Sequence, residues 1–111
     1  MKFLAISKMK DAALALPPAM GRQLMEATIV YMNQQKKDGK ILEMYFAPGW
    51  NHYYVIGEHK NAEDMAKDML LMPMYSYCDF ELYALSDAEA SMKIYVELMK
   101  TAEKMMPGMP K

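Results

Sequence analysis

The sequence predicts an α+β fold in which one antiparallel sheet carries helices between its strands. Two observations predict the strands: aromatic and β-branched runs at 40–46 and 52–56 flank a Pro-Gly turn, and residues 77–84 alternate between apolar and polar. A third observation predicts the helices, since apolar residues recur at spacings of three and four elsewhere. With 111 residues, 53% of them hydrophobic, the chain is expected to be a single domain, 1–111, with a real core.

The N-terminal part predicts a strand, a connection and a long helix. Residues 2–7 are the first strand, and residues 11–16 are expected to be a connection. Pro17-Pro18 opens a helix, because the N–H groups of the first turn have no intrahelical partner and proline there loses no hydrogen bond. The helix is expected to reach about Lys37, with Gly39 as its C-terminal cap.

The central part predicts a hairpin, a short helix and a strand. Gly49 lies in the turn between the two aromatic runs. Asn61 is the expected N-cap of a helix over 62–72, and Pro73 ends it because proline lacks an N–H. The alternating residues 77–84 then form the last strand, with Cys78 on its apolar face.

A third helix is expected over about 88–105, capped by Ser86 or Asp87 and ended by Pro107 and Gly108. The element order is therefore β-α-β-β-α-β, the ferredoxin-like pattern, plus one helix. The core covers about 1–85 and the extra helix about 87–106.

The sheet is predicted to have a second apolar face. Two helices cover one face, whereas the other carries mainly apolar residues, which mark an interaction surface. The expected members of this face are Phe3, Ile41, Tyr45, Tyr54, Ile56, Tyr77 and Tyr83. Two such faces would pair in a homodimer, or in an assembly of dimers, and enclose a barrel.

Composition excludes several partners. The net charge of -1 provides no basic field for a nucleic acid, and no run approaches the roughly 18 apolar residues of a membrane span, so a soluble cytoplasmic protein is expected. The single cysteine, Cys78, cannot form an internal disulfide and is interpreted as a small buried hydrophobe. The 15 methionines fall mostly at helical core spacing, which favours packing over copper binding.

The stretch from Leu71 to Leu82, with Gly39-Lys40 opening a strand and Gly49 in the turn, resembles the muconolactone isomerases. That family carries a Leu-Pro-Leu-Phe-Pro-Tyr stretch that runs into an aspartate and a glutamate on its last strand. The resemblance covers about residues 1 to 85 and implies a dimeric α+β barrel. It also implies a lactone isomerase that shifts a proton.

The second strand departs from the family's pattern. Muconolactone isomerases commonly place basic and tryptophan side chains there, where this sequence has Leu42, Glu43, Tyr45 and Phe46. A carboxylate-bearing substrate would lack its cationic partner, so a ligand of different charge is expected.

The candidate site is predicted on the uncovered face of the sheet. If Phe46 pairs with Asn51 across the turn, Tyr45 lies opposite His52 and Glu43 opposite Tyr54, all on one face. Desolvation among aromatic side chains suits an imidazole or carboxylate to proton transfer at neutral pH. We therefore expect catalytic roles for His52, Glu43 and Tyr45, and ligand-binding roles for Tyr54, Asp79, Glu81 and Tyr83.

Each of these residues also has a structural interpretation. His52 is close to a turn and can be solvated, the glutamates can pair with lysines, and Asp79 can anchor a loop. The tyrosines can be dimer core. His59, with Glu58 and Lys60, is expected in a solvated loop.

The sequence predicts no cofactor, because it has no phosphate-binding glycine loop and no metal-ligand spacing. Haem-binding members of the superfamily use a histidine, so haem at His52 stays an alternative. The leading hypothesis is a small metal-independent isomerase-like enzyme that moves a proton on a small lactone or aromatic-derived metabolite. The alternatives are a non-catalytic small-molecule binding protein and a cofactor-free monooxygenase.

The extra helix is expected to dock, because its apolar stripe is too large to leave in water. The stripe consists of Ile94, Tyr95, Leu98, Met99 and Ala102. The neighbouring subunit is the favoured docking place, ahead of the barrel mouth and the sheet edge.

Overall fold

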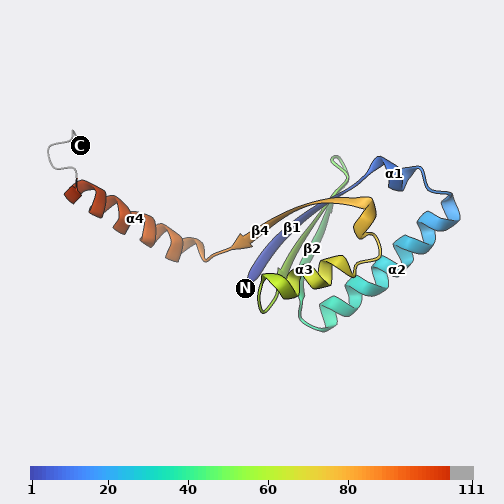
Figure 1. Ribbon diagram of the computed structural model, residues 1–111, viewed down its shortest axis with the longest axis horizontal. Helices are drawn as coiled ribbons and strands as arrows, with labels where there is room; N and C mark the ends of the chain where they lie inside the picture. The colour runs from blue at the N-terminus through green and yellow to red at the C-terminus, as the bar shows by residue number, and fades with distance from the viewer. Residues whose placement is uncertain (106–111) are drawn as a thin grey trace.

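A computed structural model describes residues 1–105 (Figure 1). The elements follow the predicted order, with one additional short helix and a 3₁₀ turn. They are β1 (Lys2–Met9), α1 (Asp11–Leu14), α2 (Pro18–Lys37), β2 (Ile41–Ala47), β3 (His52–Glu58), α3 (Ala62–Leu70), η1 (Tyr75–Tyr77), β4 (Cys78–Leu85) and α4 (Ala88–Met105).

The four strands form one antiparallel sheet in the order β2-β3-β1-β4. The two central strands, β1 and β3, are thus distant in sequence and are brought together by the α2 crossover. Helices α2 and α3 lie on the same side of the sheet (Figure 1). This arrangement confirms the predicted α+β, ferredoxin-like fold.

The hairpin pairs two residues further along β3 than predicted. Phe46 lies opposite Tyr53 rather than Asn51, so Tyr45 is opposite Tyr54 instead of His52. The predicted partner of Glu43 is likewise wrong, because its partner is Ile56. Side chains alternate with a period of two, so a displacement of two residues leaves each on the predicted face.

A β-bulge between Ile41 and Glu43 changes the face of the residue before it. Leu42 and Glu43 together oppose one residue of β3, which turns Ile41 toward the helices. Ile41 is only 8% exposed, and Phe3, at 5%, is buried on the same side.

The uncovered face, called here the open face, therefore differs from the prediction at three positions. Phe3 and Ile41 face the helices, and Tyr77 belongs to η1, before the strand begins. Leu4 and Ile6 stand on the open face in their place, since they pair with residues of that face on both neighbouring strands. The apolar members of the open face are Leu4, Ile6, Tyr45, Tyr54, Ile56, Tyr83 and Leu85.

Local signals set the helix ends. The Asn61 side chain accepts a hydrogen bond of 2.8 Å from the Asp64 N–H, the predicted N-cap. Gly39 follows α2 with a φ of 75°, a conformation that glycine adopts without strain. Residues 11–16 are more ordered than predicted, because α1 buries Ala13 against Met74 and Cys78.

Helix α4 leaves the body of the molecule beyond the end of β4 (Figure 1). Asp87 caps it by accepting a 2.8 Å hydrogen bond from the Ala90 N–H. Every α4 side chain except Ser91 is exposed, and the molecule measures 69 × 29 × 22 Å. Its radius of gyration is 19.7 Å, against about 13 Å for a compact chain of this length. The expected helix stop at Pro107 and Gly108 lies outside the described residues.

Candidate functional site

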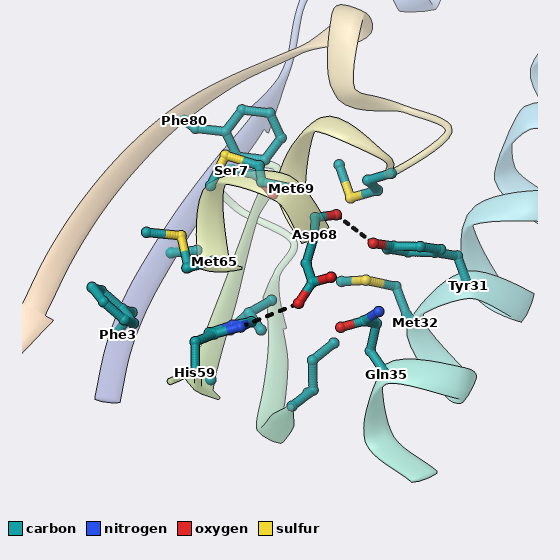
Figure 2. Close-up of a pocket in the computed structure, with 15 residues that line it drawn as sticks. Phe3, Ser7, Tyr31, Met32, Gln35, His59, Met65, Asp68, Met69 and Phe80 are labelled. Carbon is teal, nitrogen blue, oxygen red and sulfur yellow. Dashed lines mark hydrogen bonds and ion pairs between the residues drawn. The ribbon is translucent and has the colours of Figure 1, made fainter. Parts of the chain in front are cut away.

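A cavity of about 90 Å³ lies between the sheet and helices α2 and α3 (Figure 2). Its walls are mostly apolar, and four polar side chains gather at one end: Tyr31, Gln35, His59 and Asp68. The apolar lining residues include Phe3, Ala5, Ile41, Val55, Met65, Met69, Met72 and Phe80. A mainly apolar cavity with a few convergent polar groups is the usual form of a small-molecule site.

Asp68 is the centre of the polar end. Its side chain is 12% exposed, and Lys40 Nζ lies 3.2 Å from Oδ1 and 3.1 Å from Oδ2. His59 Nδ1 lies 3.3 Å from Oδ2, and the imidazole is 10% exposed. Within the described residues neither Nδ1 of His59 nor Oδ2 of Asp68 has a partner with hydrogen-bond geometry. These two atoms are therefore buried polar groups that a ligand can satisfy.

Gly57 makes the space that His59 fills. A Cβ at Gly57 would stand 3.0 Å from His59 Nε2 and 2.9 Å from the Lys40 carbonyl oxygen. The Phe3 ring lies on another side of the imidazole, with 6.0 Å between the ring centroids. His59 is thus held between the sheet and α3, and no side chain at Gly57 covers Nε2.

Tyr31 links α2 to the same cluster, because its hydroxyl donates a hydrogen bond to the Asp68 carbonyl oxygen (Figure 2). Burial, followed by the nearby Asp68 charge, raises the pKa of Tyr31 above its ordinary value. Tyr31 therefore stays protonated at neutral pH and acts as a donor. Gln35, 8% exposed, lines the cavity one helical turn further along α2.

A second, larger cavity of about 520 Å³ adjoins the first beneath α2. Four residues line both: Ser7, Met32, Val55 and Met72. The rest of its lining is largely apolar and includes Met9, Met25, Ile29, Met44, Phe46, Tyr53 and Met74. Its volume falls within the usual range for small-molecule sites, about 300–1,000 Å³.

The site residues predicted from the sequence lie elsewhere, on the open face. The register places Glu43, Tyr45, His52 and Tyr54 on that face, with Asp79, Glu81 and Tyr83 of β4. The His52 and Tyr54 rings are 6.2 Å apart and edge-on. Among the predicted residues, Tyr45 also lines the larger cavity.

Two tyrosine–glutamate pairs occupy the open face. The Tyr45 hydroxyl donates to Glu43 Oε2 at 3.1 Å, and the Tyr83 hydroxyl donates to Glu81 Oε2 at 3.0 Å. The hydrogen bond to a carboxylate raises the pKa of each tyrosine, because it favours the protonated phenol. Both pairs are exposed in the single chain.

Asp79 is also exposed, and its Oδ1 lies 3.8 Å from Lys10 Nζ. Cys78, next to it, is buried against Ala13 and Met74, as predicted. Burial raises the pKa of the Cys78 thiol, so it stays protonated and behaves as a small apolar side chain.

Sequence reasoning missed the polar end of the smaller cavity. The interpretation of His59 as part of a solvated loop is wrong, since its side chain is nine-tenths buried. Two signals were present in the sequence. Gly57 inside a strand marks a close approach of another group, and Asp68 interrupts the methionine stripe of α3.

Among residues 1–105, no group of three or more His, Cys, Asp or Glu side chains is placed to hold a metal ion. No helix in this part of the chain is long and apolar enough to cross a membrane.

Comparison with known proteins identifies the fold. No protein-family model matches the sequence, and no curated protein matches it. A crystal structure of muconolactone isomerase at 3.3 Å resolution superposes with a TM-score of 0.69, covering 78% of this chain and 90% of that one. The chain has a muconolactone isomerase-like fold. Sequence identity over the match is 20%, so the likeness concerns the fold and leaves the chemistry to be argued from the site.

Proposed function

We propose that the chain is a small metal-independent isomerase-like enzyme that shifts a proton on a small lactone or aromatic-derived metabolite. The observation that carries this proposal is the His59–Asp68 pair at the polar end of the smaller cavity, with Nδ1 and Oδ2 3.3 Å apart. An imidazole oriented by a carboxylate is a common proton acceptor at neutral pH. The muconolactone isomerase-like fold supports the reaction class.

The reaction requires only groups of the chain. His59 Nε2 removes a proton from a carbon next to the carbonyl group, breaking that C–H bond, and the double bond moves along the substrate. The imidazolium that forms is stabilised by Asp68. The proton returns to another carbon, so atoms and electrons balance without a co-reactant. Gln35 supplies an amide donor for the oxygen that carries charge in the intermediate.

The test is the isomerisation of α-angelica lactone, a small unsaturated lactone, followed by NMR in D₂O. The intact protein should move the double bond and exchange the neighbouring protons. Replacing His59 with Gln should lower the rate by roughly 10²–10⁴-fold, the usual contribution of general acid–base catalysis. A His59→Gln protein that is folded and as active as the original would refute the assignment.

A second candidate site is the open face, where His52 would be the proton acceptor. It is supported by two tyrosine–glutamate pairs on the same face of the sheet, Tyr45–Glu43 on β2, the neighbour of β3, and Tyr83–Glu81 on β4. Here Glu43 and Tyr45 would assist catalysis, and Tyr54, Asp79, Glu81 and Tyr83 would bind the ligand. His52→Gln is the matched variant: loss of activity there, with His59→Gln unaffected, would transfer the chemistry to the open face.

We also propose that the open face pairs with a second copy of the chain, which would cover Leu4, Ile6 and Tyr54 and enclose the His52 region. The support is the run of apolar side chains across all four strands. A cavity of 520 Å³ equally suits a protein that binds an apolar metabolite without changing it. Ligand binding without proton exchange in any variant would favour that role, and product oxygenation would favour a cofactor-free monooxygenase.

A further inference from the structure

The two cavities on the helix side of the sheet adjoin each other along four shared lining residues, and their other walls differ. Ser7 and Val55 from the sheet, with Met32 and Met72 from the helix layer, line both parts. The larger part is bounded mainly by methionine and aromatic side chains, whereas the smaller part ends at His59 and Asp68. A ligand that occupies both cavities must therefore be amphipathic, with its polar head at the His59–Asp68 pair, called here the dyad.

The size of each part limits the ligand. The smaller part, at about 90 Å³, has far less room than the larger part, at about 520 Å³, so the head is a small group. The larger part has room for an aromatic ring with a short chain. Methionines at the junction adapt to irregular shapes because the side chain is unbranched and flexible.

The charges around the two cavities limit the head further. Among the described residues that line the two parts, none is lysine or arginine. Lys40, the nearest ammonium to the dyad, is already engaged by both oxygens of Asp68. A ligand carboxylate would meet the Asp68 carboxylate without a cation of its own, and burying such an unpaired charge is costly.

We propose that the two cavities together bind an uncharged amphipathic molecule, with one hydroxyl or carbonyl head at His59–Asp68 and an apolar ring or short chain in the larger cavity. A hydroxyl head can donate to Asp68 Oδ2, which is paired by charge with Lys40 but accepts no hydrogen bond within the described residues. The reacting carbon then lies beside His59 Nε2. This substrate class rests on the proposed function, because it places the reacting group beside the proposed base.

The test compares two probes of matched shape, 4-butylphenol and 4-butylbenzoate, by isothermal titration calorimetry at pH 7.5. The neutral phenol should bind at least ten times more tightly than the anionic benzoate. Met32→Trp, which fills the junction, should weaken binding of the phenol by at least tenfold, and Met25→Trp, in the larger part alone, should do the same. Met20→Trp, at an exposed position of α2 that lines neither cavity, is the matched control and should bind the phenol normally.

Equal or tighter binding of the benzoate would overturn the proposal, and so would unchanged phenol binding in folded Met32→Trp and Met25→Trp proteins. Circular dichroism and thermal melting establish that each variant is folded. The binding result can be distinguished from the result for the proposed enzyme activity, because the two are measured separately. Phenol binding that follows the expected pattern, in a protein that does not isomerise the lactone, would retain the ligand class and remove the enzyme.

Discussion

At the scale of single residues, Gly57 determines whether the dyad can exist. The glycine lies in β3 opposite both Phe3 and Ile41, at the point where the imidazole of His59 folds back over the strand. Its missing side chain leaves room for His59 Nε2 on one side and for the Lys40 carbonyl oxygen on another. The backbone of a neighbouring strand cannot move aside as a flexible side chain can, so the space is fixed.

Gly57→Ala should therefore destabilise the protein by about 1–3 kcal/mol, the usual cost of overpacking. The added Cβ would stand 2.9 Å from the Lys40 carbonyl oxygen, closer than real Cβ contacts, and would also push the imidazole away from Asp68. Urea denaturation measures the change in unfolding free energy. Gly21→Ala is the control, since nothing lies within 4 Å of its Cβ, and alanine favours helix α2. Equal stability of the two variants would show that the site near Gly57 relaxes freely.

At the scale of elements, Asp68 fastens α3 to the sheet. Lys40 immediately precedes β2, His59 immediately follows β3, and Tyr31 belongs to α2, so one aspartate contacts three parts of the fold. Asn61 caps the first turn of α3. The methionine side chains of the helix pack against the sheet but make no polar contact that would fix its position. The contacts of Asp68 with Lys40, His59 and Tyr31 therefore determine the position of α3 over the smaller cavity.

Lys40→Gln should lower the unfolding free energy by about 1–3 kcal/mol, because the Asp68 carboxylate would remain buried without its ammonium partner. Lys67→Gln on the exposed side of α3 is the matched control and should change stability little. An equal loss in both variants would mean that general charge, and not the Asp68 pair, stabilises the helix.

The elements themselves were predictable because each has a local signal. The prolines at the start of α2, the Asn61 cap and the alternation of β4 act within a few residues, and the structure reproduces all three. The bulge at Ile41–Glu43 has no comparable signal in the sequence, so the predicted face of Ile41 was wrong. A period-two pattern predicts a face only while the pairing stays regular.

The candidate site was harder to predict because it depends on contacts between distant segments. The open-face residues all lie on strands of one sheet. The alternation of side chains along each strand was therefore enough to predict that they share a face. His59 and Asp68 belong to the end of a strand and to a helix, and only the packing of α3 brings them to 3.3 Å. The tyrosines, by contrast, hydrogen-bond to glutamates two residues away, a contact that strand geometry predicts.

At the scale of the whole molecule, α4 extends away from the sheet, and among its side chains only Ser91 is partly buried (Figure 1). One face of α4, apolar except for Ser91, repeats at alternating spacings of three and four, the pattern of a helix that packs against others. The repeating positions are Ala88, Ser91, Tyr95, Leu98, Ala102 and Met105. The opposite side carries three glutamates and three lysines, with ion pairs such as Glu89–Lys93 at 3.2 Å. Balanced charge does not favour an anionic membrane, which attracts helices rich in lysine and arginine.

We predict that α4 docks on a second copy of the chain. Tyr95 and Leu98 are 66% and 62% exposed, and helices in proteins gain most of their stability from the packing of an apolar face, which α4 lacks in the single chain. Deleting residues 87–111 should weaken self-association, measured by sedimentation equilibrium, and should increase the binding of a hydrophobic dye to the partner surface left uncovered. Leu98→Glu should have the same effect, because burying its charge on docking is costly. Lys100→Gln, on the polar side, should not. Unchanged assembly and melting temperature in both the truncated protein and Leu98→Glu would show that α4 is dispensable.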